Sequence, residues 1–262
     1  MRLSTRSWGP SNGGPVICVH GLTQHGGIFD SLGRRLGAAG HAVTAVDIRG
    51  HGASGREPPW SIETHVDDLL ATADALAIER ATWIGHSYGG RLVAALAARA
   101  PQRVDRLALL EPGLSVPPQY ALQRAEIDRL DWSFATVDGA ANAILTADAV
   151  VAAPQAVIAA YVKDDVRQGP DGRFRFSYCP SAAVVAWSEM TLPPPPIVAL
   201  PTLLVGAVVP LFDGRAQLRR YREALGSLLK VVTVPNGHNV LWESPTETAA
   251  AIEDFVGATN VA

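Results

Sequence analysis

A serine inside a glycine-rich turn is the strongest candidate for chemistry in this sequence. Residues 85–89 read Gly-His-Ser-Tyr-Gly, so Ser87 occupies the centre of a G-x-S-x-G pattern. The pattern follows an apolar run at residues 81–84 and precedes a helix-forming stretch rich in alanine and leucine. A sharp turn from a strand into a helix strains the serine backbone and exposes its hydroxyl at the edge of a sheet. The positive end of the new helix points at the same hydroxyl, so we predict that Ser87 is a nucleophile.

A serine hydroxyl is a poor nucleophile unless a base takes its proton during attack. Among seven histidines, only His238 lies after the last expected strand and before the last expected helix. That place puts it at the carboxyl edge of a parallel sheet, the same edge as Ser87. The segment Asn236-Gly237-His238 is typical of a turn that presents a side chain outward. We predict His238 as the base; the alternative is an exposed loop histidine.

Attack on a carbonyl group creates an oxyanion, which needs hydrogen-bond donors already aimed at it. The backbone N–H of Tyr88, directly after the nucleophile, is one expected donor. The loop His20-Gly21-Leu22-Thr23 follows the apolar strand at residues 16–19, and Gly21 allows its backbone to approach closely. We expect the Leu22 N–H to be the second donor.

Short apolar runs alternate with helical patterns along the chain, as in a parallel α/β sheet. The expected strands are residues 16–20, 42–48, 81–85, 104–110, 202–207 and 229–234. Helices are expected after the cap Ser61, from Tyr88 to before Pro101, from about residue 214, and from Pro245. This pattern predicts a mostly parallel central sheet with helices on both faces.

The alternation is interrupted between about residues 113 and 199. The segment begins with prolines, continues as irregular helices and ends in four consecutive prolines at 193–196. We predict a core of residues 1–112 and 200–262, with 113–199 as a helical lid over the site. The alternative is a packed surface appendage without a role in the site.

Composition limits the classes of partner. The chain has 262 residues, 48% hydrophobic and 18% charged, with a formal net charge of −3. This balance gives no basic excess for nucleic acid or anionic lipid, and no cofactor motif is apparent. The long uncharged stretch from Met190 to Phe212 holds six prolines, which would break a spanning helix repeatedly.

Cysteine usage and the first residues of the chain bear on the compartment. Cys18 and Cys179 lie far apart and suggest neither a disulfide framework nor a metal site. No histidine–carboxylate cluster has the spacing of metal ligands. The first fifteen residues lack the apolar core of a secretory signal. We therefore expect a cytoplasmic protein without a metal.

Four segments resemble enzymes of the α/β-hydrolase fold, in the esterase/lipase group, over essentially the whole chain. They read VHGLTQHG, DIRGHGASG, GHSYGG and NGHNV, in the order and spacing of that family. The resemblance implies a serine hydrolase that cleaves carboxylic esters through an acyl-enzyme. It also implies that the loop with Asp47 and Arg49 supports the fold beside the site, where we expect both to bind turn amides and nearby charges.

The resemblance leaves the third member of a Ser-His-acid triad open. The family usually carries an aspartate just after the strand that here reads PTLLVGA, yet this chain continues with Val208 and Val209. Asp213 comes later and fits better as a helix cap. Some members instead use the end of the strand after the nucleophile helix, which here is Glu111. We predict Glu111 over Asp213; a third possibility is that the acid is missing.

The expected substrate is a small, hydrophobic ester. The tryptophans at 132 and 187 and the segment YCPSAAVVAWSEM give the lid apolar and aromatic surface, which suits a hydrophobic pocket. Ordinary packing explains any one of these side chains equally well.

Alternatives to an esterase are a carbon–carbon bond hydrolase, a cofactor-free haloperoxidase, or a sensor of small molecules with little turnover. A halide-releasing or epoxide hydrolase is disfavoured because those relatives need an aspartate at position 87. A scaffold without a site leaves the strained turn unexplained.

Overall fold

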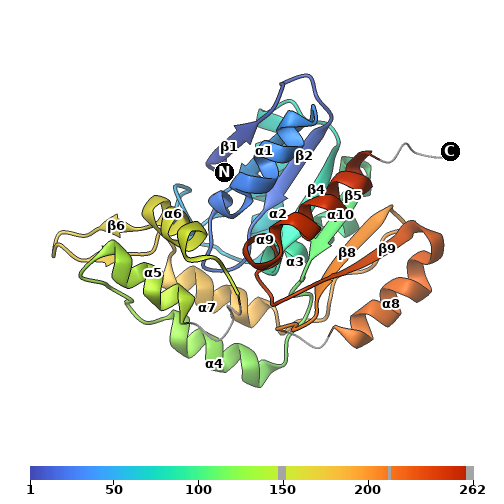
Figure 1. Ribbon diagram of the computed structural model, residues 1–262. Helices are drawn as coiled ribbons and strands as arrows, with labels where there is room; N and C mark the ends of the chain where they lie inside the picture. Colours follow the sequence, from blue (N-terminus) through green and yellow to red (C-terminus); the bar gives the residue numbers. More distant parts are fainter. Residues whose placement is uncertain (147–151, 212–213, 258–262) are drawn as a thin grey trace.

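A seven-stranded sheet forms the centre of the molecule in a computed structural model that describes residues 1–146, 152–211 and 214–257 (Figure 1). The strands are β1 (Thr5–Trp8), β2 (Pro15–Val19), β3 (Ala42–Val46), β4 (Ala81–His86), β5 (Val104–Leu110), β8 (Thr202–Ala207) and β9 (Leu229–Val234). Their order is β1-β3-β2-β4-β5-β8-β9. Strand β1 pairs with β3 in antiparallel fashion at one edge, and the other neighbours are parallel.

All six strands expected from the sequence are confirmed, with small shifts at their ends. Strand β1 was not expected, because its sequence TRSW lacks the apolar run that marks a buried strand. It lies at the sheet edge, where one side remains unpaired and half-buried polar residues are tolerated. The predicted mostly parallel sheet is therefore correct, with one antiparallel edge.

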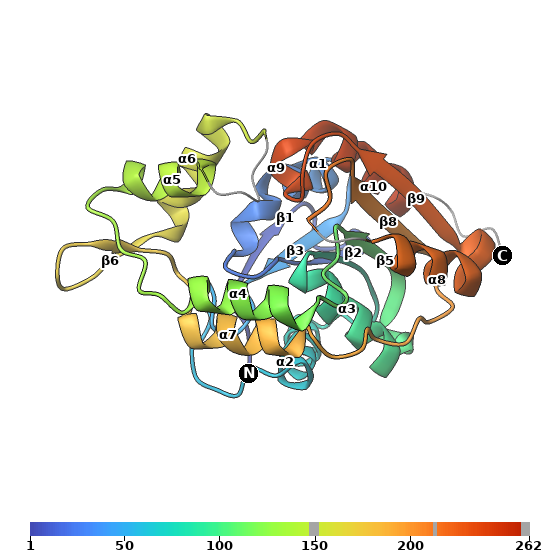
Figure 2. The same cartoon turned by 90° about the horizontal axis from the view of Figure 1, so that it is seen from below.

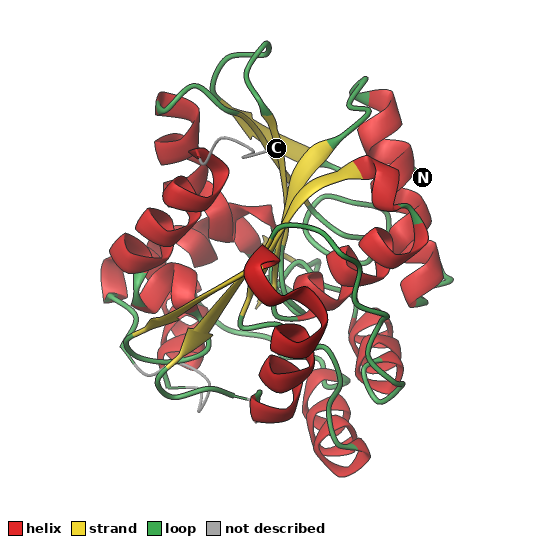
Figure 3. Ribbon diagram, turned by 90° about the vertical axis from the view of Figure 1, so that its right-hand side faces the viewer, coloured by secondary structure: helices red, strands yellow, loops and turns green. Residues whose placement is uncertain are grey.

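Helices cover both faces of this sheet (Figure 3). Those of the core are α1 (Asp30–Ala38), α2 (Ile62–Ala75), α3 (Tyr88–Arg99), α8 (Arg215–Leu225), α9 (Val240–Glu243) and α10 (Pro245–Gly257), with short 3-10 turns η1 (Gly26–Phe29), η2 (Pro101–Arg103) and η3 (Gly226–Leu228). Ser61 caps α2 as predicted, accepting a hydrogen bond from Thr64 N–H. In the described part of the chain, no helix is long and apolar enough to cross a membrane.

Alternating strand residues divide the core into two clusters, one on each face. Trp83 of β4 belongs to the cluster that includes residues of α2, α3 and α8, whereas its neighbour Ile84 belongs to the cluster that includes residues of α1 and α10. Both side chains are almost fully buried. Because successive side chains of a strand point to opposite faces, a run of apolar residues is what a strand buried on both faces needs.

The segment between β5 and β8 forms a second group of elements (Figures 1 and 2). These are α4 (Pro118–Asp128), α5 (Val137–Leu145), α6 (Gln155–Asp165), β6 (Arg167–Gln168), β7 (Phe174–Arg175) and α7 (Pro180–Glu189). Helix α4 packs beside α7, and α5 beside α6. Ile158 of α6 and Trp187 of α7 are buried in the two core clusters. The segment thus packs against the core; its role as a lid stays a prediction.

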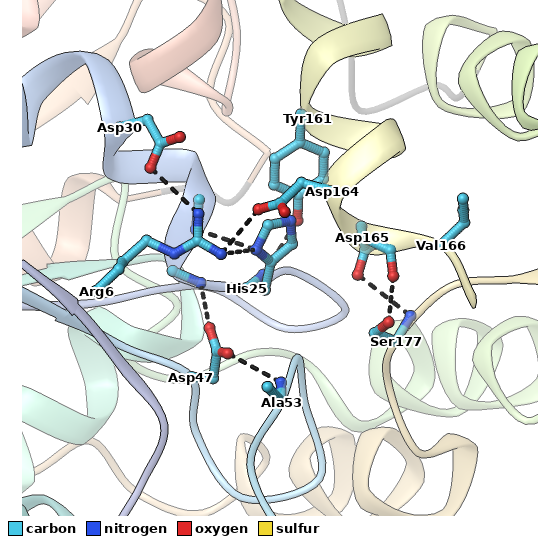
Figure 4. Close-up of polar contacts among 12 residues, drawn as sticks. Arg6, His25, Asp30, Asp47, Ala53, Tyr161, Asp164, Asp165, Val166 and Ser177 are labelled. Atoms are coloured by element: carbon cyan, nitrogen blue, oxygen red, sulfur yellow. Dashed lines mark hydrogen bonds and ion pairs between the residues drawn. The ribbon is translucent and has the colours of Figure 1, made fainter.

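Polar contacts join α6 to the loops beside the sheet (Figure 4). Arg6 of β1 donates to Asp30 at 3.3 Å and to Asp164 of α6 at 2.8 Å. His25 donates its backbone N–H to the Tyr161 hydroxyl at 3.1 Å, and the two rings stack with centroids 4.3 Å apart. These contacts fix α6 to the loop that precedes η1.

Asp165, the last residue of α6, is a buried carboxyl group next to this network. It is 3% exposed and accepts a hydrogen bond from Ser177 N–H at 3.2 Å. Burial raises the pKa of Asp165 to about 7, and nearby Asp47 and Asp164 act in the same direction. The pKa of this carboxyl group in the unfolded chain is about 4. Between pH 4 and 7 the group is therefore protonated in the native state and ionised in the unfolded state. Stability contributed by protonated Asp165 is therefore lost as the pH rises through this window.

We expect Asp165→Asn to remove this loss of stability at high pH while keeping an acceptor for the Ser177 N–H. At pH 8 the free energy of unfolding of the variant should be about 2–4 kcal/mol higher than that of the wild type, and at pH 4 the two should be equal. Urea titrations at both pH values measure it. Asp164→Asn is the matched control: that side chain is 54% exposed and pairs with Arg6, so its effect should be small. An equal effect of Asp165→Asn at both pH values would contradict the assignment.

Candidate active site

Ser87 lies in the tight turn between β4 and α3. Its φ of +52° is a left-handed conformation that is strained for a serine. The Ser87 N–H donates to the carbonyl of Leu110 on the neighbouring strand at 3.0 Å. A Cβ atom built on Gly89 would lie 2.1 Å from the carbonyl oxygen of Val19. Only glycine therefore allows α3 to start this close to β2, as the G-x-S-x-G pattern predicts.

The structure brings together the three residues predicted for a triad. His238, in the loop after β9, places Nε2 2.9 Å from Ser87 Oγ. Its Nδ1 lies 3.4 Å from Glu111 Oε2. His238 and Glu111 are 6% and 7% exposed. A hydroxyl, an imidazole and a carboxylate in this order can move a proton from the hydroxyl and stabilise the resulting imidazolium.

Glu111 follows directly after β5 and is held in place by the next strand. Its φ is +42°, and its N–H donates to the Val205 carbonyl at 2.8 Å. Its Oε1 accepts the N–H of Ala207, the last residue of β8, at 2.7 Å. One carboxylate oxygen is therefore fixed by β8, while the other faces His238.

The position after β8, where the family usually carries its acid, holds Val208, which is 66% exposed. Asp213 lies outside the described residues. Helix α8 begins after the N-cap Gly214, which makes no side-chain cap hydrogen bond. Among the described residues, Glu111 is the carboxylate that His238 contacts through Nδ1.

The loop predicted to form an oxyanion hole lies directly beside Ser87. A Cβ atom built on Gly21 would lie 3.0 Å from Ser87 Cβ, so this loop passes within van der Waals contact of the serine. Leu22 follows it and is 9% exposed. Tyr88 is the first residue of α3, and an N–H at that place has no acceptor within its own helix. Both predicted amides belong to backbone adjacent to Ser87; their role stays a prediction.

Gln24 joins the loop at Gly21 to the loop that carries His238, and the sequence analysis did not identify it. Its Oε1 accepts the Gly21 N–H at 3.0 Å, and its Nε2 donates to Asn239 Oδ1 at 3.1 Å. Its Oε1 also lies 3.0 Å from Nδ1 of His86, whose Nε2 donates to the His238 carbonyl at 3.0 Å. The sequence feature that could have identified Gln24 is a long amide side chain three residues after Gly21.

Glu243 is a second residue that the sequence analysis missed. It is buried, and its carboxylate accepts the N–H of Gly237 at 3.0 Å and of Asn239 at 3.3 Å. These two amides flank His238, so Glu243 fixes the turn that presents the imidazole. A buried carboxylate that accepts two turn amides is well satisfied.

Other histidines near the site are structural. Burial lowers the pKa of His86 to about 3 and that of His20 to about 4, so both remain neutral at physiological pH. His20 Nε2 accepts the Ile48 N–H at 3.0 Å. Within the described ranges, no group of three or more histidine, cysteine or acidic side chains could hold a metal ion.

The predicted structural roles of Asp47 and Arg49 are confirmed. Asp47 accepts the N–H groups of Gly26 at 2.8 Å and Ala53 at 2.9 Å. Arg49 makes two hydrogen bonds to Asp68, at 2.7 and 2.9 Å.

A cavity of about 490 Å³ opens beside Ser87 and His238. Its walls include residues 21–24 and side chains of the segment between β5 and β8, among them Tyr120, Trp132 and Trp187. This volume lies within the usual range for a small-molecule site.

Comparison with known proteins identifies the family of this chain. The sequence model of the alpha/beta hydrolase fold family matches residues 14–245. Lipase LipV of Mycobacterium tuberculosis is 30% identical over 97% of this chain and 98% of its own length, and esterase YbfF of Escherichia coli is 39% identical over 43% of each. The crystal structure of E-2-(acetamidomethylene)succinate hydrolase superposes with a TM-score of 0.85 at 25% identity, covering 98% of this chain and 95% of the other. The chain therefore belongs to the α/β-hydrolase family.

Proposed function

We propose that this protein hydrolyses carboxylic esters of small, hydrophobic molecules through an acyl-enzyme. The observation that carries the proposal is the hydrogen-bonded series from Ser87 to His238 to Glu111 at the wall of a ligand-sized cavity. The relatives named lipase and esterase support the ester as the bond cleaved.

In the proposed reaction, Ser87 Oγ attacks the ester carbonyl while His238 Nε2 takes the hydroxyl proton. The oxyanion accepts hydrogen bonds from the N–H groups of Leu22 and Tyr88. Collapse of this intermediate expels the alcohol, which receives the proton from His238 and leaves the acyl group on Ser87. Water then attacks the acyl-enzyme with His238 as base, which releases the acid and restores the serine. Glu111 stabilises the imidazolium in both halves.

The segment 113–199 is the proposed lid over this reaction. Many of the cavity-lining side chains belong to it, among them Phe134 and Tyr178. A wall of this kind buries the apolar part of an ester and limits the access of water to the acyl-enzyme. No cofactor takes part in the proposed steps.

The test is sustained turnover of p-nitrophenyl esters from acetate to palmitate, combined with covalent labelling by a fluorophosphonate. We expect many turnovers per protein molecule and a single label on the peptide that contains Ser87. A protein that labels but completes at most one turnover on every ester would be a sensor rather than an enzyme. Absence of both labelling and turnover would overturn the proposed nucleophile and favour a different bond type.

A further inference from the structure

One helix of the proposed lid presents a cation to the cavity. Tyr120, Arg124 and Ile127 of α4 all line the cavity that contains Ser87. They are spaced four and three residues apart, so they share one face of the helix. Of the described residues that line the cavity, Arg124 is the one arginine or lysine. The remaining lining is dominated by aromatic and aliphatic side chains.

The guanidinium of Arg124 forms an ion pair with Asp128 at the cavity wall. Its Nη2 lies 3.7 Å from Asp128 Oδ1, which is within ion-pair range but longer than a hydrogen bond. The guanidinium also lies over the Trp187 ring, 5.8 Å from its centroid. The Arg124 side chain is 34% exposed. Among the residues described, no hydrogen bond satisfies its five N–H groups.

One oxygen of Asp128 has a second partner, and the other faces Arg124. Its Oδ2 accepts the indole N–H of Trp187 at 2.6 Å, and the residue is 5% exposed. Burial raises the pKa of Asp128, while the Trp187 hydrogen bond and Arg124 lower it. The Asp128–Trp187 pair thus supports the ring below the guanidinium, and the N–H groups of Arg124 make no hydrogen bond to the described residues, so they can donate to a ligand.

A guanidinium is always charged and matches a carboxylate with two parallel hydrogen bonds. In a largely apolar cavity such a pair is stronger than in water, and an uncharged ligand group would leave the donors unsatisfied. We propose that Arg124 binds a carboxylate of the substrate, so that the preferred esters are those that carry a free carboxylate away from the ester bond. This inference rests on the proposed ester hydrolysis and names its substrate class.

Two substrate pairs test the proposal, each consisting of an acid and its neutral, nearly isosteric amide. Monoethyl adipate and its terminal amide place the group on the acyl side, while 4-butyryloxybenzoate and 4-butyryloxybenzamide place it on the alcohol side. In at least one pair, wild type should prefer the acid by about 10- to 100-fold in kcat/KM. Arg124→Gln should lower kcat/KM for the acid about 10- to 100-fold more than for the amide, so that the preference is lost, and Arg124→Lys should keep part of it.

Arg129→Gln is the matched control, since Arg129 lies beyond the C-terminal end of α4, is exposed and pairs with Glu126 at 2.6 Å. It changes the net charge equally and should leave the preference intact. If Arg124 only packs against Trp187, then Arg124→Gln lowers acid and amide alike, and the proposal is wrong. Amides that react as well as acids in both pairs also overturn it. Turnover of p-nitrophenyl butyrate, which carries no carboxylate, measures ester hydrolysis alone. A failure of the proposed function can therefore be distinguished from a failure of the Arg124 proposal.

Discussion

Replacement of Ser87 by alanine is expected to lower kcat for ester hydrolysis by about 10⁴-fold or more. The hydroxyl is the atom that bonds the acyl group in the proposed reaction, and His238 Nε2 lies 2.9 Å from it. Alanine keeps the Cβ atom, so the strained turn at φ +52° remains as it is. The variant should therefore fold with nearly unchanged thermal stability. Initial rates with p-nitrophenyl butyrate, measured together with thermal unfolding, give both quantities.

Ser227→Ala is the matched control for this variant, because Ser227 is exposed in η3 at the opposite end of the sheet. It should retain full activity, which would exclude differences between protein preparations as the cause of the loss in Ser87→Ala. The fluorophosphonate label should be lost from Ser87→Ala and kept in Ser227→Ala. A folded Ser87→Ala protein that keeps more than about one hundredth of the wild-type rate would refute the acyl-enzyme, since loss of a serine nucleophile leaves far less.

The central fold was predictable because its signals are local. Short apolar runs between turn signals, such as residues 81–84, favour strands covered on both faces, and the glycine at position 89 is required by contact with a neighbouring strand. The same local signals place Ser87 and His238 at one sheet edge. Strand β1 lacked such a signal, because an edge strand needs only its hydrogen-bonded partner β3.

The supporting contacts of the site were not predictable, since they depend on which loops meet. Gln24 joins residues that are far apart in the sequence, reaching Asn239 through its amide. Glu243 acts through two turn amides that any acceptor could satisfy. Arg124 reads in the sequence as one charge among many on a helix, and its place in the cavity depends on the packing of α4 against α7. Residues of this kind are identified by tertiary structure alone.

Glu111→Gln is expected to lower kcat by about 10³- to 10⁴-fold with little change in KM. Glutamine can still accept the Ala207 N–H that Glu111 Oε1 binds at 2.7 Å, so the side chain should keep its place. It cannot stabilise a charged imidazole, and its amide N–H₂ would face His238 Nδ1 and favour the wrong tautomer. Steady-state kinetics across the p-nitrophenyl ester series, with thermal unfolding as a check of folding, measures the effect.

Asp213→Asn removes the competing carboxylate and serves as the comparison. If Glu111 is the acid of the triad, this variant keeps wild-type kcat, because Glu111 Oε2 already lies 3.4 Å from His238 Nδ1. The opposite result is a large loss of kcat in Asp213→Asn with a kcat of Glu111→Gln within about tenfold of wild type. Asp213 would then be the acid, because a tenfold loss in Glu111→Gln lies far below the cost of a missing triad carboxylate. Glu111 would then be a structural carboxylate that joins β5 to β8. Full activity of both variants would mean that hydrolysis proceeds without a triad acid, and the short Ser87–His238 contact would carry the reaction alone.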